Sequence, residues 1–206
     1  MRLLFFTDIH GSEKYLNEII RKSHDADVLV CTGDLTIFED NLDYILKKLN
    51  SIGKTVILIN GNHESESTMA ALCMRYKNLK FIHKSHYIIE DIIFFGYGGG
   101  GFSVNDSSFD KASEIFIKEY DKISKRENKN FKLILLTHAP PYGTNIDNIS
   151  GDIEYHVGCR NIFEFIKKYQ PLIAVSGHIH EAFELEDRID KTLILNPGPR
   201  GKILFV

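Results

Sequence analysis

Side chains that can bind metal ions follow five short apolar segments of this chain. In chain order they are Asp8 and His10, Asp34, Asn62-His63-Glu64, His138, and finally His178 and His180. Each motif taken alone is also typical of a turn or of a satisfied polar group. Five of the nine histidines lie at such segment ends, however, and this repetition favours a shared site. In open α/β sheets ligands bind beyond the carboxyl ends of the strands, so we expect these residues to converge.

A site for two divalent cations is the chemistry that suits this set. Two ions about 3.5–4 Å apart need a bridging group, and a carboxylate has two oxygens to supply one. Asp34 is the central candidate for the bridge. We expect Asp8, His10 and one histidine of the final pair to bind one ion, and Asn62, His138 and the other histidine to bind the second. Imidazole, carboxylate and amide ligands together suit Mn, Fe, Zn or Ni better than Ca or Mg.

The final pair, His178 and His180, is separated by one residue. In an extended chain both side chains would point to the same face, which would let each histidine reach a neighbouring ion.

Two kinds of element alternate along the chain and must position these residues. Continuous apolar runs between turn residues predict strands buried on both faces, and apolar residues at helical spacing predict amphipathic helices. We expect strands at Leu3–Thr7, Val28–Thr32, Thr55–Ile59, Ile88–Ile89, Ile92–Gly96, Leu133–Leu136, Leu172–Val175, Phe183–Glu186, Leu193–Leu195 and Ile203–Val206. We expect helices at Glu13–His24, Leu42–Leu49, Ser67–Tyr76, Phe109–Ser124 and Asn161–Tyr169. Strands crowd the later part, so we predict an α/β fold with two mixed sheets face to face and helices outside.

The composition is that of an ordinary globular protein and argues against several classes. The length of 206 residues predicts one domain, taking about 150 residues per domain as a guide. A net charge of −3 excludes charge-driven disorder and makes nucleic acid an improbable partner. Three widely spaced cysteines form no CxxC pair and indicate a reducing compartment. The sequence has neither a secretory leader nor a membrane-spanning apolar run, so we expect a cytoplasmic protein without membrane contact.

In this order, the motifs resemble those of the calcineurin-like metallophosphoesterase superfamily, in particular its small prokaryotic members. The residues that carry the resemblance are Asp8-x-His10, Gly33-Asp34, Gly61-Asn62-His63-Glu64, His138 and Gly177-His178-x-His180. The resemblance implies a four-layer α/β/β/α sandwich, in agreement with the strand pattern. It also implies that residues 1–206 form a single metallophosphoesterase domain.

The resemblance further implies a role for each residue of the site. The first ion would be bound by Asp8, His10, Asp34 and His180, and the second by Asp34, Asn62, His138 and His178. His63 would bind no metal; it would contact the phosphate and protonate the departing alkoxide. Hydroxide held between the two ions would attack phosphorus in line. Glu64 directly follows His63 in the sequence, and from this position it would either orient His63 or serve as an acidic residue in the first turn of a helix.

The segment after His138 is similar to a loop that small prokaryotic members place across the mouth of the active site. Its candidate substrate contacts are Tyr142, Asn145, Asp147 and His156. For His156 the alternative is an ordinary loop histidine. A run of glycines, Gly98–Gly101, is expected at the rim of the site, where bare backbone can approach a phosphate. The remaining histidines, His24, His83 and His86, are expected to be structural.

The activity we expect is that of a metal-dependent phosphodiesterase acting on small phosphodiesters or nucleotides. Protein serine/threonine phosphatases of the superfamily follow the second aspartate with Asp-Arg-Gly, whereas Leu-Thr-Ile follows Asp34 here. A phosphomonoesterase of the same fold is the alternative enzyme. A nuclease is disfavoured by the negative net charge. A noncatalytic scaffold is the alternative from another class, and the presence of His63 and of every expected ligand favours catalysis over it.

Overall fold

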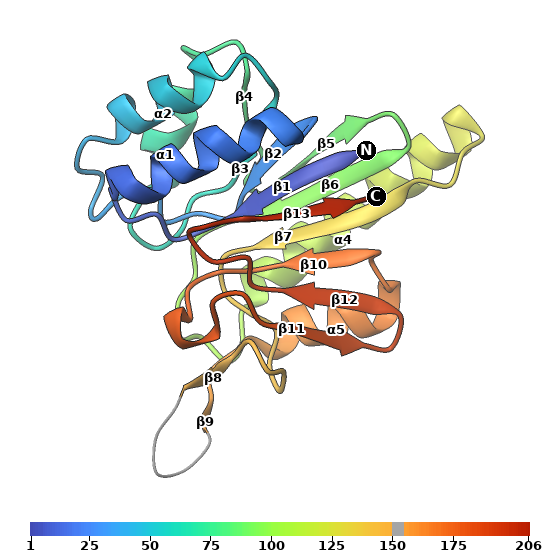
Figure 1. Cartoon of the computed structure of the whole chain (residues 1–206). Helices are drawn as coiled ribbons and strands as arrows, with labels where there is room; N and C mark the ends of the chain where they lie inside the picture. Colours follow the sequence, from blue (N-terminus) through green and yellow to red (C-terminus); the bar gives the residue numbers. More distant parts are fainter. Residues whose placement is uncertain (150–154) are drawn as a thin grey trace.

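Two β-sheets lie face to face with helices on both outer sides, so the chain has the four layers expected from its sequence (Figure 1). The structure is a computed structural model, and it describes residues 1–149 and 155–206. Within these residues, no helix is both long and apolar enough to span a membrane. The prediction of an α/β fold with two mixed sheets is confirmed.

The first sheet has five strands in the order β13-β1-β2-β3-β4. Their bounds are β1 (Arg2–Phe6), β2 (Val28–Cys31), β3 (Val56–Leu58), β4 (Leu79–Phe81) and β13 (Lys202–Phe205). Strands β1 to β4 are parallel, and β13 pairs antiparallel with β1. Parallel strands end at the same edge of a sheet, so the loops that follow β1, β2 and β3 lie together.

The second sheet has six strands in the order β11-β12-β10-β7-β6-β5. Their bounds are β5 (Ser85–Ile89), β6 (Ile92–Tyr97), β7 (Lys132–Thr137), β10 (Ile173–Val175), β11 (Glu186–Ile189) and β12 (Thr192–Leu195). The inner strands are parallel, whereas the edge strands β5 and β11 are antiparallel to their neighbours. A separate hairpin consists of β8 (Asn148–Ile149) and β9 (Tyr155–His156). Because β7 and β10 are parallel, the loops that follow them lie at the same edge of this sheet.

The helices are divided between the two outer faces. Their bounds are α1 (Glu13–Lys22), α2 (Leu42–Ser51), α3 (Glu66–Cys73), α4 (Ser107–Glu127) and α5 (Arg160–Tyr169), with short 3₁₀ turns η1 (Ser23–Asp25) and η2 (His180–Ala182). Helices α1 to α3 pack on the first sheet, and α4 and α5 pack on the second (Figure 1). The side chains of Ser12, Ser65 and Asp106 accept hydrogen bonds from the first turns of α1, α3 and α4. Such caps stabilise helices by about 1 kcal/mol each.

Alternation along the strands explains why the sandwich has four layers. In β1, Leu4 and Phe6 pack beneath the helices, whereas Leu3 and Phe5 face the second sheet. Successive side chains of a strand point to opposite faces, so a strand covered on both faces must be apolar throughout. Burying each of these side chains contributes roughly 1.5–3 kcal/mol.

Several elements differ from the sequence-based expectations, among them α3, which begins at Glu66 and ends at Cys73. The strand predicted at Phe183–Glu186 is wrong, because the chain first turns through η2 and strand β11 begins only at Glu186. The Phe183 ring instead packs on the ring of His180, with 4.9 Å between their centroids. Strand β4 was not predicted, because Lys80 interrupts the apolar pattern of this edge strand. Helix α4 extends beyond both predicted ends, and its cap at Asp106 explains the earlier start.

Candidate metal centre

The loops that follow β1, β2, β3, β7 and β10 carry the predicted metal-binding residues to one edge of the sandwich. In the first cluster, ligand atoms of Asp8, His10 and His180 lie within 4.8 Å of one another. In the second cluster, ligand atoms of Asp34, His138 and His178 are equally close. Asp34 lies between the clusters, because its Oδ2 is 3.8 Å from Nε2 of His10 and 3.3 Å from Nε2 of His138.

In the first cluster, ring nitrogens gather around one carboxylate oxygen. Oδ1 of Asp8 is 3.6 Å from Nε2 of His10 and 3.7 Å from Nε2 of His180. The two ring nitrogens are 3.1 Å apart. Nδ1 of His10 lies 3.3 Å from the carbonyl oxygen of Thr36, a contact in which Nδ1 must donate. His10 therefore directs the lone pair of Nε2 at the cluster, as a metal-bound histidine does.

The second cluster repeats this arrangement at greater depth. Nδ1 of the fully buried His138 donates to the carbonyl oxygen of Thr32 at 2.8 Å, so the neutral ring has its lone pair on Nε2. That lone pair faces Oδ1 of Asn62 at 3.0 Å and the carboxylate of Asp34. The buried Nε2 of His178 has no hydrogen-bond partner among the described residues. Acceptors that face acceptors need a cation between them, so this set of donor atoms fits a divalent metal ion.

The electrostatics of the centre also favour positive charge. Burial acts to raise the pKa of Asp8, but hydrogen bonds from His10 and His180 outweigh it and hold this pKa far below its ordinary value. Burial opposes the shift at Asp34 as well, where the hydrogen bond and charge of His138 lower the pKa. Burial lowers the pKa of His138, but contact with Asp34 dominates and raises it to about 9. In the absence of a metal ion, a proton on His138 is thus stabilised at the position where a metal ion would carry the positive charge.

The ligand loops hold a strained backbone conformation. Four of the predicted ligands have positive φ: Asp8 (52°), His10 (47°), Asp34 (49°) and His178 (70°). This conformation costs roughly 1–2 kcal/mol per non-glycine residue and persists only where the surroundings fix it. His178 is therefore not extended, and η2 begins at His180, so the expectation of two histidines on one face of an extended chain is wrong. Tertiary contacts bring the two rings to separate clusters instead.

Glu64 acts on the backbone of the ligand loops and not on His63. Its buried carboxylate accepts hydrogen bonds from the backbone N–H of Asp34 (3.1 Å) and Gly61 (3.0 Å), and from the backbone N–H and hydroxyl of Thr36 (2.9 and 3.0 Å). Burial, and then the charge of Asp34, raise the pKa of Glu64. No hydrogen bond joins it to His63 within the described residues. The interpretation that Glu64 orients the His63 ring is therefore replaced by a role in joining two loops.

The second interpretation of Glu64, as an acid in the first turn of a helix, is also wrong. Helix α3 begins at Glu66, and Ser65 caps it, so Glu64 precedes the helix. The acidic residue in the first turn is Glu66.

His63 lies beside Asp34 and His10, with which it forms a third group of close ligand atoms, and one of its ring nitrogens is unpartnered within residues 1–149 and 155–206. Its backbone N–H donates to Oδ1 of Asp34 at 3.0 Å, and its Nε2 is 4.0 Å from Oδ2 of the same residue. The ring packs edge-on against His10 and Phe38, with centroid distances of 5.1 and 4.8 Å. Nδ1 is buried without a hydrogen-bond partner in the described part of the chain. A ring in this position can exchange a proton with a group bound between the clusters.

The four predicted substrate contacts lie in the loop after β7, outside the two clusters. Asp147 is fully buried, and its carboxylate accepts bonds from three backbone N–H groups of its own loop and from Nδ1 of His156 at 2.8 Å. The expectation that Asp147 contacts substrate is therefore replaced by a structural role. The backbone N–H of exposed Asn145 donates to Asp187. The ring of Tyr142 is 5.7 Å from that of His156. Strand β8 of this loop contacts η2, which places the loop beside His180.

Two aromatic residues at the rim of the site, Phe38 and Phe102, were assigned no role from the sequence. Both are exposed, and the centroid of the Phe102 ring is 4.7 Å from that of the His178 ring. The expected rim position of the glycine run agrees with a hydrogen bond from Gly99 N–H to the carbonyl oxygen of Asn60, two residues before Asn62. The available signal was the phenylalanine that follows the Asp34 motif for Phe38, and the phenylalanine that follows the glycine run for Phe102.

Comparison with known proteins found similarity in sequence and in fold. Residues 1–182 match the sequence profile described as calcineurin-like phosphoesterase. A protein of Methanocaldococcus jannaschii named "Uncharacterized protein MJ1162" is 30% identical over 211 residues, which cover 100% of this chain and 91% of that protein.

Two solved structures share the fold. A dimetal phosphatase from Danio rerio has a TM-score of 0.61 and 9% identity, over 94% of this chain and 86% of that one. An archaeal phosphodiesterase has a TM-score of 0.54 and 16% identity, over 96% of this chain and 84% of that one. At these identities the likeness shows the fold.

Proposed function

The chain belongs to the calcineurin-like phosphoesterase family, and on this basis we propose that it is a phosphohydrolase that uses two divalent metal ions. Its proposed substrates are small phosphodiesters or nucleotides, and residues 1–206 are proposed to form one catalytic domain. The observation that carries the proposal is the position of Asp34 between two clusters of imidazole and carboxylate acceptors. The fold shared with a dimetal phosphatase from Danio rerio supports a pair of ions.

Each cluster is assigned one ion in this proposal. The first ion would be held by Asp8, His10, Asp34 and His180, and the second by Asp34, Asn62, His138 and His178. The ions would be Mn, Fe, Zn or Ni, since nitrogen ligands suit these metals. His10 and His138 are held in the required tautomer by main-chain carbonyl oxygens.

The chemistry is divided between the ions and the side chains. When bound, two such ions supply charge neutralisation for phosphoryl oxygens and lower the pKa of a water molecule. Asp8 and Asp34 remain ionised, because hydrogen bonds from histidines outweigh the effect of burial on their pKa values. His63 donates a proton to the leaving oxygen as general acid. The bond from its N–H to Asp34 fixes its position relative to the clusters.

Diesters are preferred over monoesters in this proposal. The carboxylates of Asp8 and Asp34 pair only with histidines among the described residues, and no Lys or Arg contributes. The fold shared with an archaeal phosphodiesterase agrees with this preference. The cytoplasm is the proposed location, since Cys31, Cys73 and Cys159 are free thiols.

Hydrolysis of two chromogenic esters tests the proposal. Metal-stripped protein given Mn²⁺ should hydrolyse bis(4-nitrophenyl) phosphate faster than 4-nitrophenyl phosphate. Asp34→Asn and His63→Ala should lose most of this activity, and His24→Ala, which changes an exposed histidine on another loop, should keep it. A faster monoester reaction would favour the phosphomonoesterase. Equal rates for the wild type and the two site variants with Mn, Ni, Fe and Zn would favour a noncatalytic scaffold.

A further inference from the structure

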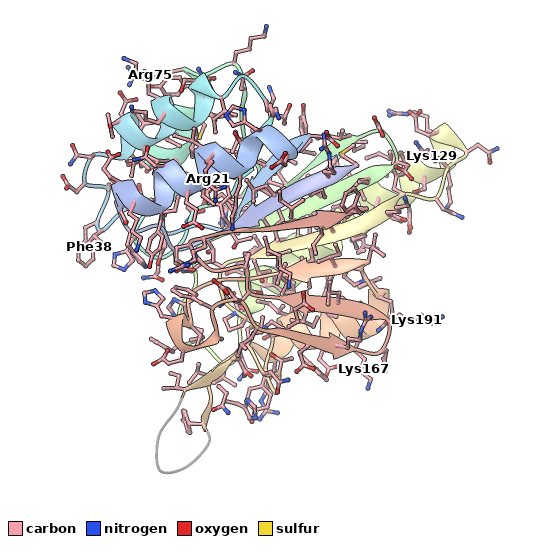
Figure 2. All side chains as sticks on the ribbon, in the orientation of Figure 1. Arg21, Phe38, Arg75, Lys129, Lys167 and Lys191 are labelled. Atoms are coloured by element: carbon pink, nitrogen blue, oxygen red, sulfur yellow. The ribbon has the colours of Figure 1, made fainter. Side chains whose placement is uncertain are left out.

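Two exposed aromatic side chains, Phe38 and Phe102, flank the candidate metal centre; we call this pair the aromatic rim. Phe38 is 80% exposed and Phe102 is 63% exposed. Phe38 follows β2 of the first sheet and packs on His63, and Phe102 follows β6 of the second sheet and packs on His178. Figure 2 shows Phe38 projecting from the edge of the molecule. The rim therefore borders the site with residues from both sheets.

The loop that presents Phe38 is held in place at a cost in backbone strain. Phe38 and Glu39 both have positive φ, 50° and 66°. The carboxylate of Glu39 anchors the loop, because it accepts bonds from the N–H of Ser65 at 2.7 Å and from the hydroxyl of Thr68 at 3.1 Å. Strain that the surroundings maintain around an exposed apolar ring is typical of a functional position.

The loop that presents Phe102 is tied down at its start. The N–H of Gly98 donates to Nδ1 of His83 at 2.8 Å, and the N–H of Gly99 donates to the carbonyl oxygen of Asn60 at 2.8 Å. A side chain at Gly98 would overlap Asn60, so glycine allows this close approach. His83, which is expected from the sequence to be structural, therefore supports the rim.

We infer that the aromatic rim binds a nucleobase, so that the substrates are nucleoside phosphoesters. This inference rests on the proposed function. The ions proposed at the centre would bind the phosphoryl group, which leaves the rest of the substrate to be recognised by residues around the centre. Exposed phenylalanine rings beside a phosphate site suit a planar group joined to that phosphate through a sugar. Stacking of a base on an aromatic ring is strong and does not depend on the identity of the base.

A comparison of two ligands that differ only in the base tests the inference without turnover. The full chain loaded with Mn²⁺ is titrated by calorimetry with AMP and with ribose 5-phosphate, and phosphate release is assayed in the same samples. We expect AMP to bind roughly tenfold or more tightly than ribose 5-phosphate, the range of one stacking contact. A wild-type affinity ratio near one would overturn the inference.

Paired substitutions separate stacking from simple apolar contact. Phe38→Ala with Phe102→Ala should reduce the ratio to near one, and so should the corresponding leucine pair, which keeps apolar surface without a planar face. Phe205→Ala removes an 82% exposed ring on β13 and should keep the full ratio. A ratio that survives in the alanine or leucine pair would overturn the inference. An intact ratio in a protein that hydrolyses no phosphoester would support base binding and overturn only the proposed hydrolysis.

Discussion

Replacing Glu64 by alanine should destabilise the protein and weaken both halves of the candidate metal centre. The Glu64 carboxylate joins the loop after β2 to the loop after β3 through four hydrogen bonds of 2.9–3.1 Å. Three of the four donors are the backbone N–H of Asp34 and the backbone N–H and hydroxyl of Thr36. Both residues are at most 2% exposed. Alanine would leave these buried donors without a protein partner.

The expected loss follows from the cost of unsatisfied donors. Each buried donor left unpaired costs about 1–3 kcal/mol. The total cost is smaller than the sum over the donors, because the substitution also removes a carboxylate that is buried and close to the charge of Asp34. These two factors, burial and the charge of Asp34, raise the pKa of Glu64. We therefore expect the free energy of unfolding to fall by about 3–5 kcal/mol, as for other broken buried networks. Glu64→Gln should lose about 2–3 kcal/mol, because its NH₂ group would face at least one N–H donor in either orientation of the amide.

Urea unfolding of the metal-free protein measures this effect apart from metal binding. Circular dichroism is the suitable probe, since the chain contains no tryptophan. Glu114→Ala, which removes an exposed carboxylate from α4, is the matched control and should change stability by less than about 0.5 kcal/mol. Calorimetric titration with Mn²⁺ should then show weaker binding to both Glu64 variants. If Glu64→Ala unfolds within about 0.5 kcal/mol of the wild type, the buried network does not stabilise the loops as reasoned.

Three further perturbations give distinct outcomes. Asp147→Ala should lower the free energy of unfolding by about 2–4 kcal/mol, because it leaves buried N–H groups and His156 unpaired; unchanged urea unfolding would restore Asp147 as a substrate contact. Gly61→Ala should abolish tight Mn²⁺ binding, since its Cβ would lie 2.6 Å from Cγ of Asp34, whereas Gly101→Ala meets open space and should bind normally; equal metal content in the two variants would contradict the geometry. EDTA should lower the melting temperature of the Mn²⁺-loaded protein, because the ions bind only the folded chain; identical melting curves would argue against a metal centre.

The sequence by itself determined the fold class and the set of residues at the centre. A strand covered on both faces must be apolar throughout, so segments such as those at residues 3–6 and 133–136 were visible in the sequence. Polar residues could then follow only at the strand ends. The metal-binding motifs therefore had a predictable place at the carboxyl edge of the sheets.

Tertiary structure alone decided how these residues act on one another. Thr32 fixes the tautomer of His138 from 106 positions away, and His10 meets His180 across 170 positions. The role of Glu64, the burial of Asp147 and the left-handed backbone of the ligand loops depend on such contacts. Sequence spacing encodes local periodicity, whereas these partners are set by the order of strands and by packing between the sheets. For that reason the convergence of the candidate metal-binding residues could be predicted from the sequence, and the hydrogen bonds that hold them could not.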